Sequence, residues 1–334
     1  MLIERTTDKS ILPEAVDSLV TSDNVSTYCG EYNPPKRPPL GIYNISLHKV
    51  VVGFRHVLDA LDTLQQEQPF RDEKQYGTKF DARLVESQEN LIKSIQEYFD
   101  GCMDTLRCFY PAAIGDRTKV FWKDPVVDSY WSAIKDKFFD PISEIANHIK
   151  HDEGRLILLV MFNDEYAIPG YYAEAVDEYG RIVPYRKIHQ PFRSKLDPTA
   201  GYDTAFSFAR DLRYLLWGIY FVSHHLATAI NTITRNIQPT KYAAVGKMDG
   251  DILEISRRVA GLPKRFYSDE LYKDLPTVEV IDNDQETTLR LAYPGTDLLI
   301  ASDGKHMNLV PLVSDGISKQ FKFPYLIASD LDGK

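Results

Sequence analysis

The chain has 334 residues, of which 43% are hydrophobic and 26% are charged, and its formal net charge is -9. This composition is typical of a globular protein with a large apolar core, and it excludes a disordered or fibrous chain. The acidic total argues against a protein that coats nucleic acid, because binding phosphates requires a basic surface. The apolar runs are too short to span a bilayer and no secretory signal pattern is present, so we expect a cytoplasmic protein without membrane contact.

The first 40 residues are polar overall and end in a proline-rich stretch at residues 33–39. Proline lacks a backbone N–H and fixes φ, so prolines at four of the six positions 34–39 favour extended backbone over a helix. We therefore predict an extended, polar and proline-rich N-terminal arm over residues 1–40. A proline-rich ligand for the aromatic groove of a partner is the alternative.

Four long segments carry apolar residues at three- and four-residue steps, which predicts amphipathic helices. Because Pro141 cannot continue an ordinary helical hydrogen-bond ladder, we expect an interruption within the third segment, at Asp140-Pro141. A shorter helix is expected later in the chain. The predicted long helices are residues 46–64, 81–110, 125–151 and 204–237, and the shorter one is residues 251–259.

Between the third and fourth long helices the pattern changes to that of strands. Residues 155–162 form a continuous apolar run, which predicts a buried strand. Residues 171–176 and 182–188 flank Asp177-Glu178-Tyr179-Gly180, which predicts a β-hairpin with glycine at a left-handed turn position. Further strands are expected at residues 277–281, 287–292, 297–301, 309–313 and 321–327, with residues 302–305 as a hairpin tip.

Together these elements predict an α+β fold built mainly from helices. We expect a helical bundle over residues 41–240 with a β ribbon inserted at about residues 155–190. A smaller, strand-rich segment of mixed α/β character is expected to follow over residues 241–334.

The densest cluster of polar residues lies at residues 144–155, at the predicted end of the third helix. Asn147 and His151 are four residues apart and therefore share one face of a helix. Two histidines that are three residues apart, with no further matched ligands, do not make a metal site, so we expect neither metal nor cofactor. A structural interpretation is also open, in which Lys150 and His151 stabilise the negative C-terminal end of the helix and Gly154 ends it.

This arrangement of helices, with Asn-x-x-x-His near the end of the third one, resembles the HEPN group of helical proteins over roughly residues 45–235. Many members of that group are RNA-cleaving toxins or defence components of prokaryotes, and others are inactive binding modules. Their active motif is an arginine, a polar residue that is often asparagine, and a histidine, which together serve a metal-independent attack of a 2′-hydroxyl on the adjacent phosphate. Asn147 and His151 match the last two, but Ala146 stands where the guanidinium that grips phosphate would lie.

The fourth long helix offers a second candidate site. At about 100° per residue, one stripe of this helix carries two arginines, two aromatic residues and a histidine. The stripe fits an anion pocket, in which guanidinium groups hold a phosphate or carboxylate and aromatic rings stack on the ligand. The alternative is a packed helix whose arginines pair with nearby carboxylates. The stripe consists of Arg210, Arg213, Trp217, Tyr220 and His224.

Several functional hypotheses follow, with the partner undetermined. Ala146 favours a bacterial HEPN-like module of a defence or stress system that binds RNA or a protein without catalysis; homo-oligomerisation is also open. The second hypothesis is a ribonuclease with Asn147 and His151 as catalytic residues, in which Arg213 faces His151 and replaces the missing arginine. The third is an enzyme or binder of a small anionic ligand. The residues expected to contact a ligand are Lys150, Arg155, Arg210, Arg213, Trp217, Tyr220 and His224.

Overall fold

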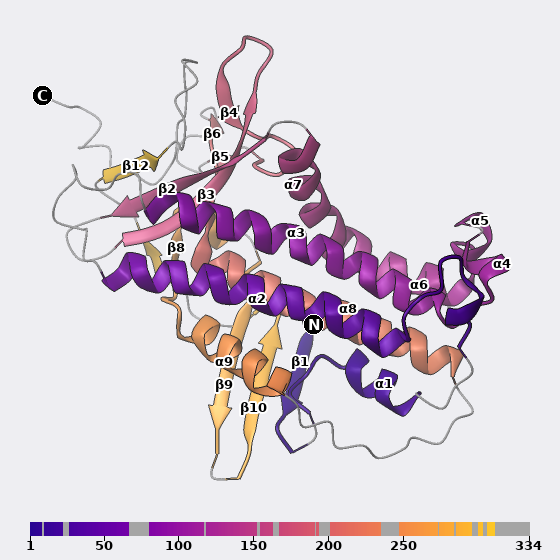
Figure 1. Ribbon diagram of the computed structural model, residues 1–334. Helices are drawn as coiled ribbons and strands as arrows, with labels where there is room; N and C mark the ends of the chain where they lie inside the picture. The colour runs from indigo at the N-terminus through magenta and orange to yellow at the C-terminus, as the bar shows by residue number, and fades with distance from the viewer. Residues whose placement is uncertain are drawn as a thin grey trace, which may run out of the picture.

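The computed structural model has an α+β fold in which long helices dominate, as the sequence predicts (Figure 1). One β-sheet lies beside one end of the helices, and a second lies on the opposite side of the bundle (Figure 1). No helix among the residues described below is long and apolar enough to cross a membrane. The structure describes residues 1–8, 10–22, 27–66, 80–116, 118–151, 154–162, 167–190, 192–193, 201–234, 247–272, 274–283, 285–295, 300–302 and 306–310.

Four helical stretches form the bundle, and their apolar stripes pack on one another. They are α2 (Pro39–Gln66), α3 (Phe80–Arg107), a broken third helix, and α8 (Phe208–Ile233). The helix α2 begins seven residues earlier than predicted, because proline fits the first turn of a helix, where no N–H is needed. In the middle of α8, Trp217 and Tyr220 are each 1% exposed, so this helix runs through the core.

The third helix consists of α6 (Pro125–Ile134), a π-helical turn η3 (Lys135–Phe139) and α7 (Asp140–His151). The predicted interruption at Asp140-Pro141 thus takes the form of a π turn directly before the proline. Since Pro141 has no N–H to offer to the carbonyl four residues earlier, the carbonyl of Lys137 needs another donor. The hydroxyl of Tyr214 on α8 supplies it, at 2.5 Å.

The inserted ribbon is the antiparallel sheet β12-β2-β3-β4, with β7 also paired to β3. Every residue of β2 from Leu156 to Met161 is fully buried. One face of β2 joins the bundle core and the other packs on Tyr267, which explains its continuous apolar run. Gly180 has φ +73° in the predicted turn. The strands are β2 (Leu156–Phe162), β3 (Ala167–Val176), β4 (Ile182–Pro184), β7 (Phe206–Ser207) and β12 (His306–Val310).

Residues 1–40 do not form the predicted extended arm. Strand β1 (Leu2–Thr6) pairs with β10 (Thr287–Ala292), and α1 (Ala15–Thr21) packs on α8. Buried apolar residues of α1, such as Val16 and Leu19, secure this segment to the core. Its partner strand lies some 280 residues further along the chain, so local sequence gives no sign of the pairing.

The region after residue 241 packs against the bundle at several places. Helix α9 (Lys247–Gly261) contacts α2 and α8, and β9 (Thr277–Asp282) completes the sheet β1-β10-β9. Strand β11 (Ile300–Ser302) pairs in parallel with β8 (Arg265–Tyr267), whereas β12 pairs with β2, so the two do not form the predicted hairpin. The predicted tip at residues 303–305 and the predicted strand at residues 321–327 lie outside the described residues.

The remaining short elements connect these parts. They are η1 (Cys29–Glu31), α4 (Ala112–Gly115), α5 (Thr118–Phe121), β5 (Phe192–Arg193), β6 (Gly201–Tyr202) and η4 (Ser268–Tyr272).

Candidate functional site

The C-terminal end of α7 carries the polar face that the sequence analysis singled out. Asn147, Lys150 and His151 are all exposed to solvent. Asn147 and His151 lie one helical turn apart, and the amide oxygen of Asn147 accepts a hydrogen bond from Nε2 of Gln96 on α3, at 3.2 Å. We call these three exposed residues the α7 face.

The position that precedes Asn147 has the opposite environment. The side chain of Ala146 is 0% exposed and belongs to the hydrophobic core, together with Ile142 and Ile145 on the same helix. Successive residues of a helix point about 100° apart, so position 146 faces the bundle while position 147 faces solvent. The place of the motif arginine is therefore inside the protein.

Next to the α7 face, His148 fastens α7 to the β ribbon. Its ring is 4% exposed, stacks on Tyr185 with centroids 3.7 Å apart, and places Nε2 2.7 Å from the carbonyl oxygen of Glu174. Gly154 makes room for the ring, because a Cβ there would lie 2.4 Å from Nε2 of His148. His148 is thus a packed residue that fixes the angle between helix and ribbon.

Arg155, a predicted binding residue, is held in the ribbon. Its Nε atom forms an ion pair with the carboxylate of Glu174, whose side chain is 6% exposed. On the neighbouring turn of α7, Glu144 accepts hydrogen bonds from Lys187 and Tyr185, and these bonds, chiefly that from Lys187, lower the pKa of Glu144. Ion pairs and hydrogen bonds therefore tie the ribbon to the start of the α7 face.

The two arginines of the predicted anion stripe on α8 bind backbone carbonyls. Arg210 is 7% exposed and donates to the carbonyl of Asp274 at 3.0 Å. Arg213 is 2% exposed and donates to the carbonyls of Ala260 and Leu262, at the end of α9. The last carbonyls of a helix lack partners within it, and the guanidinium supplies them. Arg213 is therefore directed at α9 and does not replace the missing arginine beside His151.

The other three residues of the stripe secure the N-terminal segment. The indole N–H of Trp217 donates to the carbonyl of Met1 at 3.4 Å, and the hydroxyl of Tyr220 donates to the carbonyl of Ile11 at 2.8 Å. The Nδ1 atom of His224 lies 2.7 Å from a carboxylate oxygen of Glu14, and that hydrogen bond raises the pKa of His224. Protein groups thus occupy the stripe in place of the anion that the sequence analysis proposed.

Two carboxyl groups near the start of α8 are buried. Asp211 accepts hydrogen bonds from the hydroxyl of Tyr171 at 2.7 Å and from Nε2 of Gln88 at 2.8 Å, and burial raises its pKa to about 6. Glu270 accepts from the backbone N–H groups of Ser207 and Tyr267, each at 3.0 Å, and burial raises its pKa to about 7. The signal in the sequence was Asp211, a polar residue on the otherwise mainly apolar helix α8.

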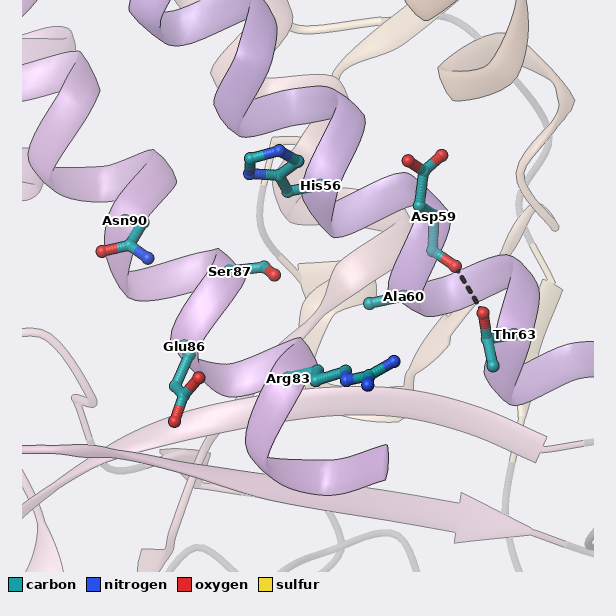
Figure 2. Close-up of a pocket in the computed structure, with 8 residues that line it drawn as sticks. All are labelled: His56, Asp59, Ala60, Thr63, Arg83, Glu86, Ser87 and Asn90. Carbon is teal, nitrogen blue, oxygen red and sulfur yellow. Dashed lines mark hydrogen bonds between the residues drawn. The ribbon is translucent and has the colours of Figure 1, made fainter. Parts of the chain in front are cut away.

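A polar groove between α2 and α3 was missed by the sequence analysis (Figure 2). It has a volume of about 270 Å³. Its residues stand on outer positions of two different helices, so no local motif reveals the cluster. The residues that line it are His56, Asp59, Ala60, Thr63, Arg83, Glu86, Ser87 and Asn90.

Comparisons with family models, with curated proteins and with solved structures found no match. The proposals below therefore rest on the residues of this chain.

Proposed function

We propose that the chain is a HEPN-like helical module that binds another macromolecule without cleaving it. The burial of Ala146 carries this proposal. The motif of the RNA-cleaving members places an arginine there, whereas this chain has an alanine that is 0% exposed, within the bundle core. A guanidinium that cannot reach solvent cannot grip a phosphate, and no other arginine takes its place on the described part of the α7 face.

The α7 face supplies the contact surface in this proposal. Its amide, ammonium and imidazole groups are exposed at a helix end, where they can form hydrogen bonds to a partner without rearrangement of the core. The ion pair of Glu144 with Lys187 and the packed ring of His148 hold α7 against the ribbon. A rigid frame that presents a few accessible polar groups suits recognition, because little conformational entropy is lost on binding.

A metal-independent ribonuclease is the second candidate, and one observation favours it. Asn147 and His151 share an exposed face with Lys150, so a histidine and a cationic group both reach solvent at the same helix end. In that case Lys150 would act as the point charge in place of the motif arginine, without the bidentate geometry of a guanidinium.

RNA incubation in EDTA separates the two candidates. The wild-type chain, His151→Ala and a control, His48→Ala, are each mixed with labelled single-stranded RNA, and intact RNA is measured over time. His48 is an exposed histidine on α2 and matches His151 in chemistry. The binding module predicts intact RNA in all three samples. Cleavage by the wild type and by His48→Ala, but not by His151→Ala, would establish the ribonuclease instead.

Binding itself is measured by the fluorescence anisotropy of the same RNA. If the α7 face contacts RNA, the triple variant Asn147→Ala, Lys150→Ala, His151→Ala binds more weakly than the wild type. Because each of the three side chains is exposed, the variant is expected to keep the fold. Equal affinity of the two proteins would remove RNA as the partner of this face.

A further inference from the structure

The groove between α2 and α3 presents three hydrogen-bond donors to solvent from two helices. In Figure 2 the guanidinium of Arg83 extends from α3 towards α2, the hydroxyl of Ser87 points the same way, and the imidazole of His56 reaches from α2 towards α3. Ala60 and Ser87 are half-buried between them. Small side chains at these positions leave the hollow open between two closely packed helices.

These donors have no partner within the described residues. No hydrogen bond or ion pair to a described group engages the side chains of His56, Arg83 or Ser87, whereas Lys49, Arg55 and Lys93 on the same helices form ion pairs. A planar guanidinium offers several N–H groups in a fixed fork, which matches the oxygens of a phosphate. The side chains of Arg83, Ser87 and His56 are therefore available to donate hydrogen bonds to a ligand in the groove.

Two acidic residues, Asp59 and Glu86, also line the groove. The carboxylate of Asp59 is 2.8 Å from Nη2 of Arg258 on α9, a guanidinium that also pairs with Asp62 and Glu254. In Figure 2 the carboxylate of Asp59 points away from Ser87. The donors of Arg83, Ser87 and His56 thus share the groove with two carboxylates, of which that of Asp59 is directed at α9.

We propose that this groove binds the phosphate group of a small ligand. The guanidinium of Arg83 would donate hydrogen bonds to two terminal phosphate oxygens. Ser87 would donate to the third terminal oxygen, and His56 would donate to the oxygen that bridges to the rest of the ligand. A phosphate offers more acceptor positions than a carboxylate, so it uses all three donors at once. The proposal concerns a different site from the α7 face and stands or falls independently of it.

The probes are inorganic phosphate, adenosine 5′-monophosphate, adenosine and acetate, each titrated into the full chain by calorimetry at low salt. We expect saturable binding of the two phosphate compounds, weakened by added salt because the site is open to solvent. Adenosine and acetate are expected not to bind. Tighter binding of the monophosphate than of inorganic phosphate assigns the site to a phosphate ester, and equal binding assigns it to free phosphate.

Four variants locate the binding. Arg83→Gln should weaken phosphate binding by about tenfold or more, because a charge-assisted bidentate contact is lost. The affinity of Arg83→Lys for phosphate should lie between those of Arg83→Gln and the wild type, because lysine keeps the charge but lacks the planar fork of donors. Arg257→Gln, at an exposed arginine on α9 outside the groove, is the matched control and should stay within about twofold of the wild type. His56→Gln tests the second donor and should weaken binding several-fold.

Circular dichroism confirms that each variant is folded, which is expected because Arg83, His56 and Arg257 are exposed. If Arg83→Gln proves unfolded, Arg83→Lys and His56→Gln decide the question. The proposal is overturned if neither phosphate compound shows saturable binding to the wild type. It is equally overturned if binding is the same in the folded Arg83 and His56 variants as in the wild type.

Discussion

Several side chains in this protein supply hydrogen-bond partners to backbone carbonyls that lack them. Arg213 supplies donors to the end of α9, and His148 links α7 to the carbonyl of Glu174 in the ribbon. The sequence predicts Arg213 as a ligand contact and gives His148 no role beyond a histidine pair that does not make a metal site. Their partners lie 26 to 49 residues away in the chain, so their structural use could not be read from spacing. By contrast, the exposure of Asn147 and His151 follows from helical periodicity.

Gly154 tests the fit around His148. In Gly154→Ala the new Cβ would lie 2.4 Å from the imidazole, so the ring must shift and its contact with the ribbon weakens. We expect the free energy of unfolding to fall by about 1–3 kcal/mol, as measured by urea denaturation. Gly250→Ala is the control: no described atom lies within 4 Å of its Cβ, and the helix α9 should gain about 0.5–1 kcal/mol. A fully stable Gly154→Ala variant would refute the packing described for His148.

At the scale of elements, the long helices and the inserted ribbon could be predicted because their burial is periodic along the chain. The limits of the helices were harder to predict. Helix α2 starts at Pro39, where the prolines had indicated an extended arm, and α8 starts at Phe208 because Ser207 caps its first turn. Strand β1 was missed because strands are specified by their partners, and β10 lies near the other end of the described chain.

The π turn η3 gives a prediction at this scale. The hydroxyl of Tyr214 donates to the carbonyl of Lys137, which Pro141 leaves without its usual N–H partner. Tyr214→Phe keeps the ring contacts and removes only that donor. We expect a loss of about 1 kcal/mol in the free energy of unfolding and faster amide exchange around residues 135–141. Unchanged exchange in this region would show that η3 does not depend on the bond.

At the scale of the whole molecule, segments far apart in the sequence pair with one another. Strand β1 joins the sheet of β9 and β10, and β12 joins the ribbon. The core also contains ionisable groups, which couple the stability of the molecule to pH. Burial raises the pKa of Asp211 to about 6, above its ordinary value of 3.8. Between pH 4 and 6 the unfolded chain releases this proton while the folded chain keeps it, so this residue destabilises the fold progressively as pH rises.

Asp211→Asn isolates that contribution, because the amide oxygen can still accept from Tyr171 and Gln88. The free energy of unfolding of the variant minus that of the wild type should increase by roughly 2 kcal/mol from pH 4 to pH 6, and level off above about pH 7. Chemical denaturation at several pH values measures this difference, and contributions of other groups such as Glu270 cancel in it. A difference that stays constant over the same range would show that Asp211 is ionised in the fold already at pH 4.

The most direct test of the proposed function restores the motif arginine with Ala146→Arg. Position 146 is 0% exposed, so the account predicts that a buried, unpaired guanidinium lowers the free energy of unfolding by several kcal/mol. RNA should remain intact in the presence of the variant. A stably folded Ala146→Arg protein that cleaves RNA in EDTA would contradict the account, because position 146 would then reach the same face as Asn147 and His151.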